Sequence, residues 1–214
     1  MPRPIRIQFP GAWYHVMNRR AGGDVLFRDT FDRLFFLSLV EEAVRTTNIE
    51  IHAYCLMGNH FHLLIRTPEP TLDRAMQLVG GKYARYFNDR LGRDGSVCRG
   101  RYRAIVVDSE RYLLAVSRYI HRNPLELGIT SIAYYGWSSY SAFLGARPPQ
   151  EWLTLTDTLE LAGGPAKYEA LVESSLPSEI EQLYNRKHHP SIIGTREFTS
   201  AVRRGSDPLG RKGV

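Results

Sequence analysis

Residues 49–66 read Ile-Glu-Ile-His-Ala-Tyr-Cys-Leu-Met-Gly-Asn-His-Phe-His-Leu-Leu-Ile-Arg, and this stretch decides the fold. Its two ends, 49–57 and 60–66, are short and rich in β-branched and aromatic residues, as strands are. Gly58-Asn59 between them is a turn signal typical of a β-hairpin. The stretch therefore predicts two antiparallel strands joined by a tight turn.

The segments before this hairpin predict one more strand and one helix. Residues 12–18 are rich in aromatic and β-branched residues and predict a strand. Asp29 or Thr30 can cap a helix that runs to about Thr47. The apolar stripe expected to face the core of this helix is Phe31, Leu34, Phe35, Leu39 and Ala43.

The segments after the hairpin repeat this pattern. Thr71 can cap a helix to about Leu91, and residues 102–107 predict a fourth strand. A third helix follows and must stop near Asn123, because Pro124 cannot continue it. This order predicts an α+β fold, namely a ferredoxin-like four-stranded antiparallel sheet with two helices on one face. The third helix would lie against the other face.

The chain changes character beyond this core and divides into three expected parts. Residues 1–145 would form the sheet-and-helix domain, and 146–202 a mostly helical C-terminal extension. Short helices are expected at 152–161, 166–176 and 178–187. Residues 203–214 are basic and rich in glycine, which predicts a flexible tail.

Composition narrows the class of protein. Of 214 residues, 43% are hydrophobic and 23% charged, as in an ordinary soluble globular protein, and no apolar run approaches a membrane span. Two cysteines, no signal-peptide core in residues 1–6 and no disulfide pattern indicate a reducing, cytoplasmic location. The net charge of +6 favours a polyanionic partner.

His60 and His62 are the first candidate site. Residues two apart in a strand project from one face, so the two imidazoles would stand side by side and form half of a metal site. Phe61, Leu63 and Ile65 would then face the packed side. Two histidines with merely structural hydrogen bonds would show the same pattern.

Tyr119 and Asn123 are the second candidate pair, because residues four apart share a helix face. Asn123 could complete the metal site, and Tyr119 would be the nucleophile one turn away. A half-buried aromatic residue and a helix cap would show the same pattern. Tyr112 is a weaker candidate nucleophile, because the residue four positions later is Val116, which cannot bind a metal.

The two pairs together suit cleavage of a phosphodiester, which needs a cation on the phosphate and an oxygen nucleophile in line. Two histidines and an amide with open positions suit Mg²⁺ or Mn²⁺, and zinc stays open as an alternative. No general base can be assigned from the sequence. Cationic residues that could contact DNA phosphates are Arg19, Arg20, Lys82, Arg85, Arg99, Arg101 and Arg103.

Several of these segments resemble one known family in the right order. They are Trp13–Arg19, Ala53–Leu64, Gly100–Arg103, Tyr112–Leu114, Arg118–Pro124 and Trp137–Tyr140. The chain resembles the single-tyrosine HUH transposases of the IS200-like group, and specifically the transposases associated with repetitive extragenic palindromes (REPs). The resemblance implies the HUH endonuclease fold, with His60 and His62 as the histidine pair, Tyr119 as nucleophile and Asn123 as the third metal ligand.

The resemblance also implies an activity and a partner. The family cleaves and rejoins single-stranded DNA beside a small hairpin with Mg²⁺ or Mn²⁺, which implies a bacterial, nucleoid-associated enzyme that acts as monomer or homodimer. One rival is a replication or conjugation relaxase, against which the compact length argues. A second is a non-catalytic hairpin-binding regulator, which would not need all four candidate residues.

Overall fold

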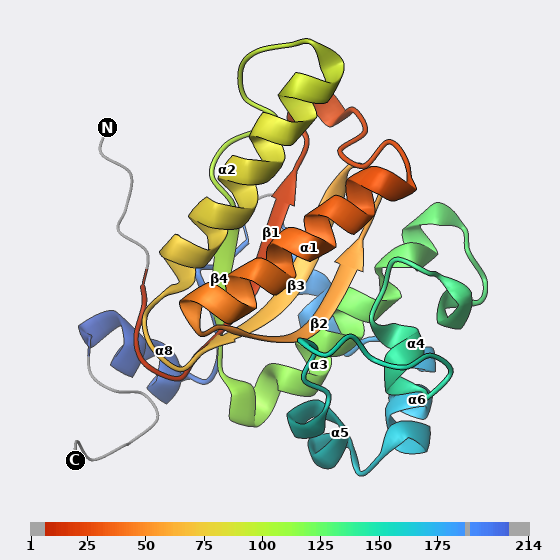
Figure 1. Cartoon of the computed structure of the whole chain (residues 1–214). Helices are drawn as coiled ribbons and strands as arrows, with labels where there is room; N and C mark the ends of the chain where they lie inside the picture. The colour runs from red at the N-terminus through yellow and green to blue at the C-terminus, as the bar shows by residue number, and fades with distance from the viewer. Residues whose placement is uncertain (1–6, 187–188, 206–214) are drawn as a thin grey trace.

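The computed structural model describes residues 7–186 and 189–205, and its centre is a mixed sheet of five strands (Figure 1). The strands are β1 (Ala12–Arg19), β2 (Glu50–Leu56), β3 (His60–Thr67), β4 (Arg103–Val107) and β5 (Ile192–Ile193). They lie in the order β2-β3-β1-β4-β5, and the first four are antiparallel to their neighbours. The predicted α+β fold with a four-stranded antiparallel core is confirmed.

The fifth strand was not expected from the sequence. β5 has two residues and pairs in parallel with β4. It forms because the C-terminal part of the chain returns to the sheet edge, where Asp108 accepts a hydrogen bond from the Thr195 amide. A Cβ atom on Gly194 would lie 2.6 Å from Phe198 and 2.9 Å from Asp108, so only glycine allows this approach.

Helices α1 (Thr30–Thr47) and α2 (Leu72–Leu91) cover one face of the sheet (Figure 1). Asp29 caps α1 by accepting from the amide of Asp32, and left-handed residues at Asn48 and Gly92 end the two helices. Phe61, Leu63 and Ile65 point to this face and are buried, as the alternation in β3 predicts.

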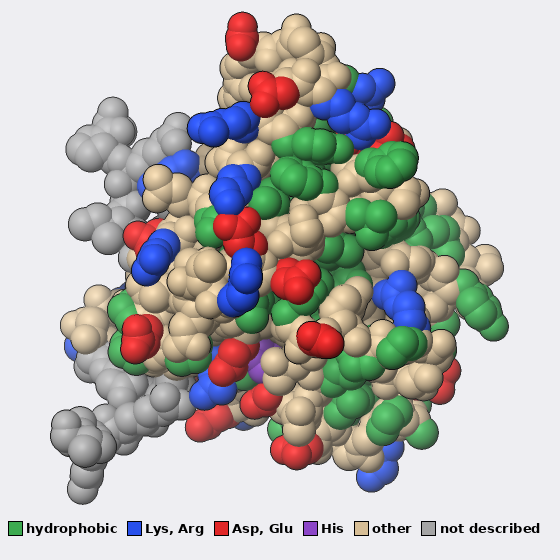
Figure 2. All heavy atoms as spheres, in the orientation of Figure 1, with side chains coloured by type: hydrophobic (Ala, Val, Ile, Leu, Met, Phe, Trp, Pro, Cys, Tyr) green, Lys and Arg blue, Asp and Glu red, His purple; other side chains and the backbone are tan. Residues whose placement is uncertain are grey.

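The predicted apolar stripe of α1 is partly wrong. Phe31 and Leu34 are 72% and 53% exposed, whereas Phe36 and Val40 are buried beside Leu39 and Ala43. The buried stripe is therefore rotated toward Phe36, which packs against Phe27, Phe61 and Tyr83. Hydrophobic side chains reach the surface near the start of α1, among interspersed acidic and basic groups (Figure 2).

Helix α3 (Ser109–Arg122) lies on the opposite face, as expected, and contacts β2 and β3. The short 3₁₀-helix η2 (Asn123–Leu127) continues from it, with Pro124 in its first turn. A second hydrophobic cluster fills this face, built from Trp13, Leu64, Ile105, Val116 and Ile120 among others. The sheet is therefore packed on both sides.

The remaining helices are short. Two of them are 3₁₀-helices, η1 (Ala21–Gly23) and η3 (Ile132–Tyr134). The others are the α-helices α4 (Tyr140–Phe143), α5 (Thr156–Ala162), α6 (Pro165–Glu173), α7 (Ser178–Tyr184) and α8 (Arg196–Arg204). No helix in the described part of the chain is long and apolar enough to cross a bilayer.

The C-terminal residues differ in part from expectation. Arg203 and Arg204, expected in a flexible tail, form the last turn of α8, where Phe198 and Val202 are buried against the core. Burial of these two apolar side chains accounts for the helix. The rest of the expected tail, residues 206–214, lies outside the described residues.

Candidate active site

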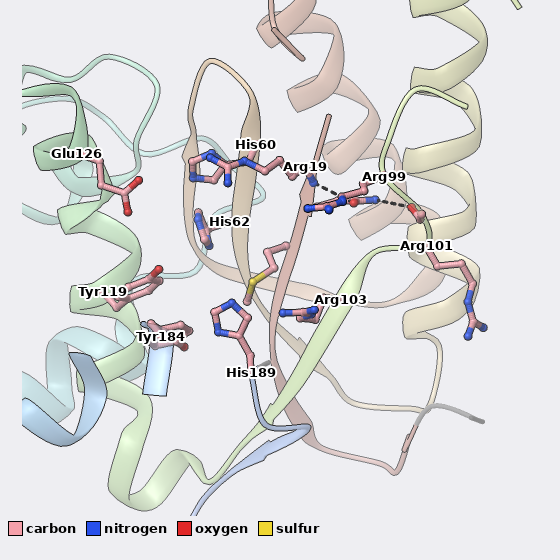
Figure 3. Close-up of a pocket in the computed structure, with 13 residues that line it drawn as sticks. Arg19, His60, His62, Arg99, Arg101, Arg103, Tyr119, Glu126, Tyr184 and His189 are labelled. Carbon is pink, nitrogen blue, oxygen red and sulfur yellow. Dashed lines mark hydrogen bonds between the residues drawn. The ribbon is translucent and has the colours of Figure 1, made fainter. Parts of the chain in front are cut away.

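A pocket of about 520 Å³ opens where the ends of β1 and β3 meet α3, η2 and α7. His60 and His62 lie in its middle, with Tyr119, Tyr184 and Glu126 along one side and the arginines of residues 19 and 99–103 along the other (Figure 3). Three of the four predicted catalytic and metal residues line this pocket. The fourth, Asn123, contacts His60 and Tyr119 from behind.

His60 is held in one tautomer by its neighbour in the hairpin turn. Its Nδ1 lies 2.7 Å from Oδ1 of Asn59, an acceptor, so Nδ1 donates and Nε2 carries the lone pair. Nε2 then faces Oδ1 of Asn123 at 3.3 Å. Burial lowers the pKa of His60, which keeps the ring neutral. Two electron-rich atoms that face each other at this distance favour a cation beside them.

His62 is more deeply placed than His60. Its Nδ1 lies 2.8 Å from Nε2 of His15, and its Nε2 is buried without a hydrogen-bond partner. Burial lowers the pKa of His62 well below its usual value, and the nearby His15 and His60 add to this effect. A buried nitrogen without a partner is costly unless a ligand satisfies it.

Tyr119 stands on α3 with its ring 5.7 Å from that of His62, centroid to centroid. Its other face stacks on Tyr184, with the centroids 3.6 Å apart and the planes at 8°. Burial, followed by the charge of Glu126, raises the pKa of Tyr119 to about 12. A side-chain contact with Asn123 has the opposite, smaller effect and lowers this pKa. The side chain is therefore a neutral phenol at neutral pH and needs a cation to favour its ionised form.

Tyr112, the rival tyrosine, lies elsewhere. Its hydroxyl donates to Glu179 at 3.0 Å, which links α3 to α7, and it is not part of the pocket. His121 is likewise excluded from chemistry. It is fully buried between the hydroxyls of Tyr168 and Ser139, both at 2.7 Å.

The donor set fits a divalent cation. Within the described residues, no three side chains from among His, Cys, Asp and Glu are grouped to hold a metal ion. Asn123, the third ligand expected from the sequence, places its amide oxygen 3.3 Å from Nε2 of His60. The unpartnered Nε2 of His62 and the opposed acceptors of His60 and Asn123 are what such an ion would satisfy.

The predicted DNA-contacting residues divide into two groups. Arg19, Arg99, Arg101 and Arg103 line the pocket. Arg20 does not, because it is buried, donates to the carbonyl of Val97 and lies 5.0 Å over the ring of Phe87. Lys82 and Arg85 lie on α2, outside the pocket, and Lys82 pairs with Glu42 at 2.6 Å.

Sequence reasoning missed four pocket residues or their close neighbours, namely His15, Glu126, Tyr184 and His189. His15 shares a strand face with Met17, which stands opposite His62, so the register of β1 and β3 would have found it. Tyr184 and His189 come from the C-terminal extension, and no sequence signal connects them to the site.

Comparison with known proteins gives a family and a shared fold. The family model for IS200-like transposases matches residues 8–123. The structure of a REP-associated tyrosine transposase bound to a REP hairpin shares the fold, with a TM-score of 0.56 and 17% identity over 77% of this chain and 96% of that one. A candidate transposase from Deinococcus radiodurans has a TM-score of 0.39 at 16% identity, over 56% of this chain and 97% of that one. No curated protein matches the chain in sequence.

The matched region carries most of the pocket. It contains the hairpin with His60 and His62, the arginine segment 99–103, and the end of α3 with Tyr119 and Asn123. It also spans more than half of the 214 residues. The chain therefore belongs to the IS200-like transposase family.

Proposed function

We propose that this transposase cleaves single-stranded DNA with Tyr119, keeps the 5′ phosphate as a phosphotyrosine, and rejoins it to a 3′ hydroxyl. The observation that carries the proposal is the position of Tyr119. It lies beside His62, in one pocket with His60 and with Arg19, Arg99, Arg101 and Arg103. Oxygen nucleophile, ligands and phosphate-binding cations lie together, as in-line phosphoryl transfer requires.

His60, His62 and Asn123 would hold a divalent cation, Mg²⁺ or Mn²⁺. When bound, it would supply Lewis-acid stabilisation of the charge on the phosphate. Arg19, Arg99 and Arg103 would bind the flanking phosphates. In the cleavage step the bond between phosphorus and the 3′ oxygen breaks, the Tyr119 oxygen takes its place, and the 3′ oxygen gains a proton. Tyr119 loses one, so the step balances and reverses without an external energy source.

The substrate we propose is a REP-type hairpin with a single-stranded flank. The solved relative with the same fold is bound to a REP hairpin, which supports this choice. Attack by a tyrosine in a half-open pocket needs a strand that can leave the base stack. A fully paired duplex should therefore be a poor substrate.

A covalent-adduct gel tests the proposal. Labelled hairpin DNA with a single-stranded 5′ flank should give a slow-migrating protein–DNA band with the wild type. Tyr119→Phe should give no adduct and should still bind the hairpin. Tyr112→Phe is the matched control, because it removes a hydroxyl from the same helix outside the pocket, and it should give the wild-type band.

Two outcomes would contradict the proposal. If the Tyr119→Phe variant still formed the adduct, Tyr119 would be excluded as the nucleophile. Binding without adduct in the wild type, over a range of divalent cations, would favour the rival function of a hairpin-binding regulator.

A further inference from the structure

Three buried side chains from distant parts of the chain form one hydrogen-bonded series that ends at His62. The hydroxyl of Tyr184, on α7, lies 2.7 Å from Nδ1 of His15 on β1. Nε2 of His15 lies 2.8 Å from Nδ1 of His62 on β3. The series spans 169 residues of sequence between its first pair, and all three side chains are buried.

Each ring in the series has a single proton to place. Both rings are buried and neither hydrogen-bonds to a carboxylate, so both are neutral. A neutral imidazole has one N–H donor and one acceptor nitrogen, whereas a hydroxyl can donate or accept. The series can therefore run in only two directions.

The two directions differ in what His62 offers to the pocket. If Tyr184 donates to His15, then His15 Nε2 donates to His62 Nδ1, and the His62 proton must sit on Nε2. If Tyr184 accepts, His62 Nδ1 donates to His15, and Nε2 has a free lone pair. Only the second direction leaves His62 able to bind a metal ion.

The surroundings of His62 favour the second direction. Its Nε2 has no hydrogen-bond partner among the described residues, and a buried N–H without an acceptor is rarer and costlier than a buried acceptor without a donor. In this direction the donor without an acceptor is the hydroxyl of Tyr184, whose hydrogen can rotate about its bond, which a ring N–H cannot do.

We infer that Tyr184 and His15 are positioning residues that hold the proton of His62 on Nδ1 and so keep Nε2 available to the divalent cation. The inference rests on the metal site of the proposed function. It gives the C-terminal extension a role in the site, because Tyr184 would be the acceptor at the far end of the series.

Tyr184→Phe would remove that acceptor and keep the ring stacked on Tyr119. His15 would then have to bury an unpaired Nδ1–H or move its proton to Nε2. The second choice moves the unpaired donor from His15, which is fully enclosed, to Nε2 of His62, which lines the pocket, and so pushes the His62 proton onto Nε2. Loss of such an outer hydrogen-bond partner typically weakens metal affinity about 10- to 100-fold.

The test measures Mn²⁺ binding by the whole chain in the absence of DNA, by calorimetry or electron paramagnetic resonance. Tyr184→Phe should bind Mn²⁺ roughly 10- to 100-fold more weakly than the wild type. Tyr112→Phe is the matched control, since it removes a tyrosine hydroxyl that contacts α7 outside the pocket, and its affinity should be unchanged. Thermal melts establish that both variants fold.

A second readout needs no metal. Nitrogen-15 NMR of the His62 ring, assigned by its loss in His62→Ala, should show the proton on Nδ1 in the wild type and on Nε2 in Tyr184→Phe. A wild-type ring protonated on Nε2 would overturn the inference.

The remaining outcomes separate the two proposals. Equal Mn²⁺ affinity of Tyr184→Phe and Tyr112→Phe, while His62→Ala still abolishes binding, would overturn the positioning role alone. Mn²⁺ binding that is unaffected by His62→Ala would overturn the metal site itself.

Discussion

The two faces of the sheet bury different kinds of side chain. β1 and β3 send alternate side chains to each face, so both faces use the same backbone. Toward α1 and α2 they send Val16, Phe61, Leu63 and Ile65, which join a hydrophobic core. Toward α3 and α7 they send His15, His60 and His62 among the apolar residues Trp13 and Leu64.

The difference shows what each face does. Apolar contacts have no direction, so the first face can tolerate exchanges that conserve volume. The second face buries imidazole rings, and each ring nitrogen needs a hydrogen-bond partner or a ligand. Nε2 of His62 has no hydrogen-bond partner among the described residues. Burying this nitrogen without a partner costs folding free energy. A binding site for a cation would involve such a cost, because the nitrogen must stay free to bind the ion. Three experiments can break or sharpen this comparison.

The largest effect is expected on the histidine face. His62→Ala should reduce DNA cleavage at least about a thousandfold, because a Lewis-acid contribution of several kcal/mol corresponds to that factor. EDTA should do the same to the wild type, and Mg²⁺ or Mn²⁺ should restore the rate. The measurement is single-turnover cleavage of the hairpin substrate. Full activity of metal-stripped protein in EDTA would refute the assigned role of this face.

A large effect on folding is expected on the apolar face. Phe36→Ala removes a buried ring that contacts Phe27, Phe61 and Tyr83, and should lower the free energy of unfolding by about 3–5 kcal/mol. Urea unfolding measures this loss. The cleavage rate per folded molecule should be unchanged, since Phe36 does not touch the pocket. A folded Phe36→Ala that has lost cleavage would show that the two faces are not separable.

The smallest effect is expected at the rim of the histidine face. If Arg99 and Arg103 contact phosphates, replacing each by alanine should lower the slope of log affinity against log salt by roughly one unit or somewhat less. Hairpin binding measured over a salt series gives the slope. Lys82→Ala serves as control, because Lys82 pairs with Glu42 outside the pocket. A slope change at Lys82 as large as at Arg99 would extend the DNA surface to α2.

The local parts of this structure could be predicted from the sequence. Gly58-Asn59 and the alternation after it place His60 and His62 on one face of β3, and α3 ends at Arg122, directly before Asn123 and Pro124. These features depend on residues a few positions apart, where turn chemistry and side-chain periodicity act directly.

The other parts depend on contacts between distant segments. Phe31 and Leu34 match a helical stripe as well as Phe36 does, and only the angle of α1 on the sheet decides which is buried. Arg20 is a cation like Arg19, but it turns inward to Val97 and Phe87. Tyr184 stands far from Tyr119 in sequence, and only the fold stacks one ring on the other.

The short strand β5 also bears on whether copies of the molecule can pair edge to edge. Without it, β4 would be an open sheet edge, with the amides of Val106 and Asp108 unpaired and available to another chain. Open edges are templates for aggregation, and natural sheets cover or interrupt them. Ile192 and Ile193 pair with β4, and Gly194 allows their close approach. Together they cover the sheet edge and so oppose edge-to-edge association. Shortened versions of the chain that lack Ile192 and Ile193 should be expected to self-associate through that edge.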